Sequence, residues 1–247
     1  MTSYSSLARF YDSLTSDVPH KAFADFYEEI WVQRGIVVKT VLDLACGTGA
    51  MTHILASRGY DVIGVDSSPD MLSIAAQKSE RADSPIFICQ QIEALDLYGT
   101  VDAAVCALDG MNYVHPKDFA EAARRIHLFL QPDGVLIFDI HTPYHLRSLD
   151  GMECLDETDD VFCLWRTEFD TGSDSLHYSF DIFERAGDLW ARSYEEHIQY
   201  AHKPESLIKT LEGAGFVEVR LFGASDKSET PSPEERRVFI TARKGSK

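Results

Sequence analysis

The fold of this chain is decided by the stretch Lys39–Asp66, which reads KTVLDLACGTGAMTHILASRGYDVIGVD. It begins with a short apolar run, 39–45, that contains one acid and leads into a turn rich in glycine. A helical pattern over 49–58 follows, and a second apolar run over 61–66 ends on another acid. Strand, glycine turn, helix, strand and acid in this order predict half of a nucleotide-binding α/β unit.

The residues of the turn suit a bound ligand. Gly47 and Gly49 lack a Cβ atom, so the chain can turn sharply and a ligand can approach the backbone. The helix that begins near Ala50 would point free N–H groups and its positive dipole end at that ligand. Asp66, at the carboxyl end of its strand, could accept two hydrogen bonds from a ribose diol.

The details of the turn favour one class of nucleotide. The dinucleotide pattern G-x-G-x-x-G fails because Thr52 stands in its third position, and the G-K-[ST] of a phosphate-binding loop is absent. Asp43 would repel a pyrophosphate but suits a ligand with an amino group. The residues Asp43–Gly49, DLACGTG, resemble motif I of the class I S-adenosylmethionine (SAM)-dependent methyltransferases. A dinucleotide site and an ordinary βα turn are the weaker alternatives.

Further landmarks of that family follow in the expected order. They are VDSSPDML at 65–72, QPDG at 131–134 and LEGAGF at 211–216, and the resemblance covers about 36–143 and 204–243. The family often places an acid after the third strand to receive the adenine amino group. Here Gln91 or the backbone of Ile92 takes that position. The cofactor residues that the resemblance implies are Tyr11, Asp43, Ala45, Gly47, Gly49, Asp66, Ser67, Met71, Gln91, Ile92 and Leu108, although Met71 could equally be a core residue of its helix.

The expected fold is a Rossmann-like sheet of seven mostly parallel strands, the last antiparallel, flanked by helices and carrying a small antiparallel β insertion. Residues 1–35 are expected to form a helical cover, and 36–143 with 204–247 a SAM-binding domain. The insertion, 144–203, contains three strand-like runs at about 161–170, 175–185 and 189–201, joined by hairpin signals. It would serve as a lid over the site or as a dimer interface built from Trp165, Trp190 and Tyr194.

No motif identifies a catalytic residue. His141, which leaves the strand expected at 135–140, is the best-placed base, with a structural histidine as the alternative. Tyr11 lies in a Tyr-Asp segment that closes over SAM in similar proteins, and Asp109 would contact the substrate or cap a helix. His197, with Arg192 and Tyr194, would line the acceptor side. Arg237 could reach an acid in the site, but we expect it at the surface.

The amino-acid composition limits the classes of molecule that the protein is expected to bind. The chain has 23 Lys and Arg against 40 Asp and Glu, a net charge of −17, which disfavours nucleic acid and favours a small-molecule acceptor. Five scattered cysteines without a C-x-x-C pair predict reduced thiols and no metal site. No apolar run is long enough to cross a membrane and no signal peptide is visible, so we expect a cytoplasmic protein.

The expected function is transfer of the SAM methyl group to an N or O acceptor on a small molecule. The alternative is a SAM-binding regulatory protein that transfers nothing and uses the insertion to form a homodimer. A nicotinamide oxidoreductase is a third reading, which would bind NAD instead of SAM.

Overall fold

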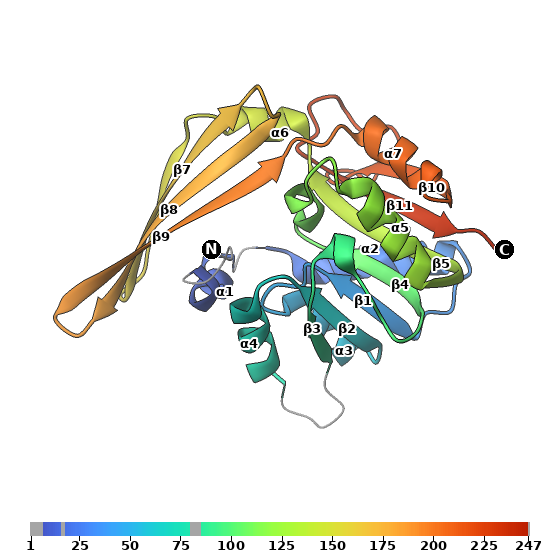
Figure 1. Cartoon of the computed structure of the whole chain (residues 1–247), viewed down its shortest axis with the longest axis horizontal. Coiled ribbons are helices and arrows are strands. Elements are labelled where there is room, and N and C mark those ends of the chain that lie inside the picture. The colour runs from blue at the N-terminus through green and yellow to red at the C-terminus, as the bar shows by residue number, and fades with distance from the viewer. Residues whose placement is uncertain (1–6, 16–17, 80–84, 247) are drawn as a thin grey trace.

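The computed structural model describes residues 7–15, 18–79 and 85–246, and within them seven strands form one central sheet (Figure 1). The strand order is β10-β11-β5-β4-β1-β2-β3. Neighbours from β5 to β3 are parallel, whereas β11 is antiparallel to both β5 and β10, which confirms the predicted sheet. The strands are β1 Thr40–Leu44, β2 Asp61–Asp66, β3 Ile86–Cys89, β4 Val101–Cys106, β5 Leu130–His141, β10 Phe216–Gly223 and β11 Arg237–Lys244.

Helices cover both faces of this sheet, because successive side chains of each strand point to opposite faces. Val41 packs into the apolar cluster formed with α2 and α3, while Leu42 and Leu44 pack into the cluster formed with α5 and α7. All three side chains are fully buried, as expected for a parallel strand covered on both sides. The helices are α2 His20–Gln33, α3 Ala50–Ser57, α4 Pro69–Gln77, α5 Phe119–Phe129 and α7 Pro204–Gly213, with 3-10 turns η2 Ile92–Ala94 and η3 Gly110–Tyr113.

Two boundaries differ from the sequence prediction. The sequence predicts a helix over about 116–130, but the helix begins at Phe119, because the preceding residues form a turn closed by a hydrogen bond from Asp118 N to His115 O. The strand expected over 135–140 begins at Leu130, because Leu130 pairs with Val101 before a register shift. The turn-like residues 131–134 therefore lie within an irregular strand.

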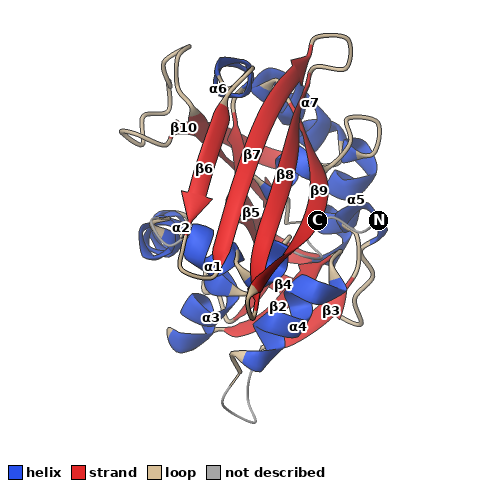
Figure 2. Cartoon of the chain, turned by 90° about the vertical axis from the view of Figure 1, so that its left-hand side faces the viewer, coloured by secondary structure: helices blue, strands red, loops and turns tan. Residues whose placement is uncertain are grey.

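A second sheet of four antiparallel strands is found in the described chain, in the order β6-β7-β8-β9. We call these residues, 153–200, the flap. Figure 2 shows its broad face, and Figure 1 shows it projecting from the central body. Three strands were expected here. The fourth, β6, was missed because it is a short acidic strand at the edge of the sheet and its sequence has no clear apolar pattern. The flap comprises β6 Glu153–Glu157, β7 Val161–Asp170, β8 Ser175–Ala186 and β9 Leu189–Tyr200, reached from β5 through α6 Pro143–Ser148.

The N-terminal segment packs against the inner face of the flap. It forms a 3-10 turn, η1 Leu7–Arg9, and a one-turn helix, α1 Tyr11–Leu14, between the flap and α4 (Figure 1). Leu7 lies in an apolar cluster with Val161, Cys163 and Ile182 of the flap. Its N–H donates to Glu195 Oε1 at 3.0 Å. The first residues of the expected N-terminal helix, 1–6, lie outside the described part.

All five cysteines are free thiols. Among the described residues, no helix combines the length and the apolar character that a membrane span requires.

Candidate functional site

A cavity of about 370 Å³ lies at the carboxyl ends of the parallel strands. Ligands of open α/β sheets bind in this position, and the volume lies within the range of about 300–1,000 Å³ usual for small-molecule sites. Most of the predicted cofactor residues line it, namely Tyr11, Asp43, Ala45, Gly47, Asp66, Ser67, Met71 and Leu108. These residues come from four separate segments of the chain, which the fold brings together around one cavity.

Three of the predicted cofactor residues do not line this cavity. Gly49 has φ +78° and permits close packing of α3 on α4, since a Cβ there would lie 3.0 Å from the Cβ of Ala75. Gln91 is exposed, and the Ile92 side chain packs into the apolar core. The contact of Gln91 or of the Ile92 backbone with adenine stays a prediction.

The glycine turn holds Asp66 at the cavity. The two oxygens of its carboxylate accept hydrogen bonds from Gly47 N and Ser68 N, each at 2.8 Å. Ala45 and Gly47 have φ angles of +50° and +53°, and a Cβ on Gly47 would meet no atom within 4 Å. The turn thus leaves open space beside a fixed carboxylate, which fits the ribose diol of SAM.

Two side chains join the N-terminal segment to the same turn. Asp12 accepts a hydrogen bond from Thr48 Oγ1 at 2.6 Å and pairs with Lys78 Nζ at 2.5 Å. Lys78 also donates to the Thr48 carbonyl at 2.9 Å. The adjacent Tyr11 lines the cavity, and burial, together with the charges of Asp109 and Asp66, raises the pKa of its phenol. The Tyr-Asp segment therefore covers the turn.

Asp43 is the buried acid of the motif. Its carboxylate accepts a hydrogen bond from Thr52 Oγ1 at 2.5 Å, and burial raises its pKa to about 7. The carboxylates that line the cavity belong to Asp43, Asp66 and Glu196, and neither lysine nor arginine lines it in the described chain. This electrostatic environment suits the positively charged amino and sulfonium groups of SAM.

Because the pKa of Asp43 is about 7, SAM affinity is expected to rise between pH 6 and pH 8. Below pH 7 the carboxyl group is protonated and lacks charge. Above pH 7 it is ionised and attracts the cationic ligand, so the affinity gained with rising pH is lost again as pH falls. Calorimetric titration with SAM should show this trend in the wild type and a much flatter one in Asp43→Asn. Equal slopes in the two proteins would remove Asp43 from the site.

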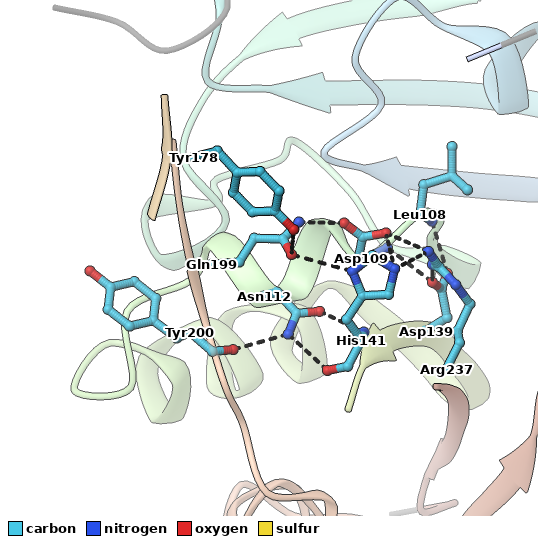
Figure 3. Close-up of polar contacts among 9 residues, drawn as sticks. All are labelled: Leu108, Asp109, Asn112, Asp139, His141, Tyr178, Gln199, Tyr200 and Arg237. Carbon is cyan, nitrogen blue, oxygen red and sulfur yellow. Dashed lines mark hydrogen bonds and ion pairs between the residues drawn. The ribbon is translucent and has the colours of Figure 1, made fainter. Parts of the chain in front are cut away.

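A buried ionic network adjoins the cavity (Figure 3). Arg237 donates to Asp109 Oδ1 at 2.7 Å and to Asp139 Oδ2, and its side chain is only 20% exposed. The expected surface position of Arg237 is therefore wrong. The reason is Asp139, a fully buried carboxylate in the apolar strand β5, which needs a cationic partner from the adjacent strand β11.

Asp139 also fixes the backbone after β4. Its carboxylate accepts hydrogen bonds from Leu108 N and Asp109 N, both at 2.9 Å. Leu108 and Asp109 each have φ +54°, a conformation that costs free energy for residues other than glycine. Asp139 and Arg237 stabilise this strained pair, which places Leu108 in the cavity wall and Asp109 beside it.

His141 has both ring nitrogens engaged in this network. Its Nε2 lies 2.6 Å from Arg237 Nη2 and 3.6 Å from Asp109 Oδ1. Its Nδ1 lies 3.3 Å from Gln199 Oε1, and Gln199 Nε2 donates to Asp109 Oδ2 at 2.5 Å. Both ring nitrogens are engaged, so His141 positions the network and is not free to act as a base in this arrangement.

Asn112 ties the flap to the central sheet. Its side-chain oxygen accepts from His141 N at 3.0 Å, and its amide donates to the carbonyls of His141 and Tyr200 at 3.1 and 3.0 Å (Figure 3). The residue is fully buried. The end of β9 is thereby held against the end of β5.

Replacing Asn112 with alanine is expected to lower the free energy of unfolding by about 2–4 kcal/mol, because three buried backbone groups lose their partner. Hydrogen exchange should accelerate most at the end of β9. Asn112→Asp should destabilise at least as much as alanine, because a buried carboxylate oxygen would then face the carbonyls of His141 and Tyr200 without a donor or a cation. Unchanged exchange in β9 would show that Asn112 does not hold the flap.

Two groupings expected from the sequence are wrong, because strand alternation divides their members between the faces of the flap. His197 faces inward and pairs with Glu195 at 3.2 Å, whereas Arg192 pairs with Asp181 on the outer face. Trp165 faces inward, while Trp190 and Tyr194 are exposed on the outer face. Neither the acceptor group His197, Arg192 and Tyr194 nor the interface of Trp165, Trp190 and Tyr194 forms one surface.

Several residues of the site were missed. The end of β9 contributes Glu196, Ile198 and Tyr200 to the cavity, and α2 contributes His20. Only the folding back of the flap brings the β9 residues there, so no local pattern could reveal them. Asp139 did leave a signal, since an acid stands inside the apolar run VLIFDI.

Comparisons with known proteins agree with this geometry. A family model described as a methyltransferase domain matches residues 41–134. The chain is 31% identical to the putative methyltransferase YqeM of Bacillus subtilis, over 98% of this chain and 97% of that protein. It also superposes on an S-adenosylmethionine-dependent methyltransferase from Clostridium acetobutylicum with a TM-score of 0.85 and 30% identity, covering 98% and 99% of the two chains. The sugar N-methyltransferase KedS8 from Streptoalloteichus shares the fold, with a TM-score of 0.78 at 20% identity over 95% and 92% of the chains. The chain belongs to the class I SAM-dependent methyltransferases, and SAM is its methyl donor.

Proposed function

We propose that this methyltransferase methylates the nitrogen of a small amine. The observation that carries the proposal is the buried carboxylate of Asp109 beside the cofactor cavity. Burial raises its pKa, but His141, Arg237 and the hydrogen bond from Gln199 outweigh that effect and lower the pKa below its usual value. Asp109 is therefore ionised and attracts a cationic acceptor.

The same geometry disfavours a hydroxyl acceptor. Deprotonating an alcohol needs a strong base near the methyl donor. Asp109 is a weak base because its pKa is lowered, and both nitrogens of His141 are engaged in hydrogen bonds. An amine needs no such base, because its neutral form is already nucleophilic.

The residues of the chain would act by binding and orientation. SAM, when bound, supplies an electrophilic methyl group on a positively charged sulfur. Asp66, Asp43 and the glycine turn would hold it, Tyr11 would exclude water, and Asp109 would orient the amine. The bound ammonium group first releases one proton to water, and the nitrogen lone pair then forms the bond to the methyl carbon as the carbon–sulfur bond breaks. The electron pair of that bond remains on sulfur, and the extra proton on nitrogen passes to water. Orientation and exclusion of water supply the acceleration.

A panel of matched acceptors tests the proposal. SAM labelled in its methyl group is incubated with the enzyme and pairs of small amines and alcohols of the same carbon skeleton. We expect labelled product from amines at least a hundredfold faster than from the matching alcohols. Faster transfer to alcohols would contradict the nitrogen acceptor, and SAM binding without transfer to any acceptor would favour the regulatory alternative.

We also propose a small-molecule acceptor and a cytoplasmic location. The net charge of −17 supports a small-molecule acceptor instead of a nucleic acid, and the five free cysteines support a cytoplasmic location. We propose that residues 144–203 form a cover that holds the N-terminal segment over the cofactor. A homodimer would use the outer face of the flap, where Trp190 and Tyr194 are exposed.

A further inference from the structure

A second cavity, of about 580 Å³, shares Leu108 with the cofactor cavity. It is formed by the start of α2, with Pro19 and Phe23, and by the loop 224–237 that joins β10 to β11. Of the predicted cofactor residues, Leu108 alone lines this space among the described residues. Because Leu108 lines both cavities, a molecule in the second one would lie a single side chain from the methyl donor.

The alternative place for an acceptor, beneath the flap, is already filled. Leu7 occupies a cluster with Val161, Cys163 and Ile182, and Phe10 and Tyr11 pack against the same cluster. The cofactor cavity itself, at about 370 Å³, is near the lower limit of volumes for one ligand. An acceptor with a body of several carbon atoms therefore needs space elsewhere.

The wall between the two cavities has a fixed backbone, whereas the Leu108 side chain is only partly buried. Leu108 and Asp109 hold positive φ angles, and Asp139 accepts both of their N–H groups. Arg237, which lines the second cavity, holds Asp109 and Asp139 from that side. Strain of this kind accumulates at functional sites, where the surrounding structure maintains it.

The lining of the second cavity indicates the ligand. Val18, Pro19, Phe23, Leu108 and Ala224 give it an apolar floor. Glu234 and Glu235 place two carboxyl groups at the cavity, and the Glu234 carboxylate has no hydrogen bond or ion pair to any described residue. Of the two arginines present, Arg237 is already paired with Asp109 and Asp139. An apolar floor with excess negative charge suits an amine that carries an apolar body.

We infer that the second cavity binds the body of the acceptor, an amine with a small apolar group, whose amino end passes Leu108 to reach Asp109 and the methyl donor. The inference rests on the proposed function, because it places the acceptor of that reaction.

The test uses benzylamine as the probe, titrated into the complex of the full chain with S-adenosylhomocysteine. Ser232→Phe and Ala224→Leu each add bulk to the second cavity from different positions. The matched control is Asp159→Phe, which adds bulk to a cavity of the flap that shares no lining residue with the other two. We expect both cavity variants to weaken benzylamine binding at least tenfold while S-adenosylhomocysteine affinity changes less than twofold. Asp159→Phe should leave both affinities unchanged, and benzyl alcohol should bind the wild type more weakly than benzylamine.

Three results would overturn the inference: no benzylamine binding to the wild type, unchanged binding in both cavity variants, or equal binding of benzyl alcohol. Failure of the proposed function can be distinguished from failure of this inference. If amines are methylated with an unchanged KM in Ser232→Phe and Ala224→Leu, the reaction stands and the placement is wrong. If benzylamine binds as expected but no amine is methylated, the cavity stands and the reaction is wrong.

Discussion

Replacing Arg237 with methionine is expected to lower the free energy of unfolding by about 3–5 kcal/mol, because removing one partner of a buried ion pair leaves the others unpaired. The two carboxylates concerned, Asp109 and Asp139, lie on either side of the guanidinium and are both buried. For a chain of this size the loss corresponds to a fall in Tm of roughly 10 °C. Thermal unfolding followed by circular dichroism measures it.

The pH dependence of this loss has a defined sign. Arg237 favours the ionised form of both carboxylates, so its removal raises the pKa of each. The stability lost should therefore be largest near pH 7, where both would be charged, and smaller near pH 4. The double variant Arg237→Met with Asp139→Asn should recover part of the loss, because one buried charge is gone. A loss that is independent of pH would contradict the ionic interpretation of the network.

Asp66→Ala is expected to weaken SAM binding more than tenfold, which corresponds to about 1.4 kcal/mol or more. The reason is the loss of charge-assisted hydrogen bonds between a fixed carboxylate and the ribose hydroxyls. Asp66 lies at the carboxyl end of β2 on the cofactor cavity, and backbone N–H groups of the glycine turn hold its oxygens in place. Calorimetry with SAM measures the change directly.

A second aspartate on the same strand, β2, provides a control for the substitution of Asp66. Asp61 stands at the start of β2, pairs with exposed Lys39 at 3.7 Å, and is not among the residues that line the cavity. Asp61→Ala should leave SAM affinity unchanged, and Asp66→Asn should fall between alanine and the wild type. Since Asp66 also fixes the turn, Tm must be compared across the set. Wild-type affinity in Asp66→Ala would remove this residue from the cofactor site.

The cofactor half of the molecule was predictable because its signals are local. The strand, turn and helix around Gly47 lie within one stretch, and the start of α4 follows from Ser68 and Pro69, where the Ser68 hydroxyl accepts from Met71 N. Both the glycine turn and the start of α4 depend on backbone conformation or helix capping among residues that are neighbours in the sequence. The central sheet then follows from the order of such units.

The ionic network around Arg237 and the arrangement of the flap were not predictable, because they depend on contacts between distant segments. Arg237 and Asp139 are 98 residues apart, and Gln199 and Asp109 are 90 apart. The role of His141 is determined by the donors and acceptors around its ring, which the sequence does not contain. The division of Trp165 and Tyr194 between two faces depends on the register of the flap strands.

We propose that this enzyme moves the methyl group of SAM onto the nitrogen of a small amine. The most direct measurement uses SAM carrying ¹³C in its methyl group, incubated with the enzyme and a bacterial metabolite extract grown on ¹⁵N. We expect a new methyl signal in the NMR spectrum that shows coupling between ¹³C and ¹⁵N. A transferred methyl group without that coupling, bonded to oxygen or carbon, would contradict it.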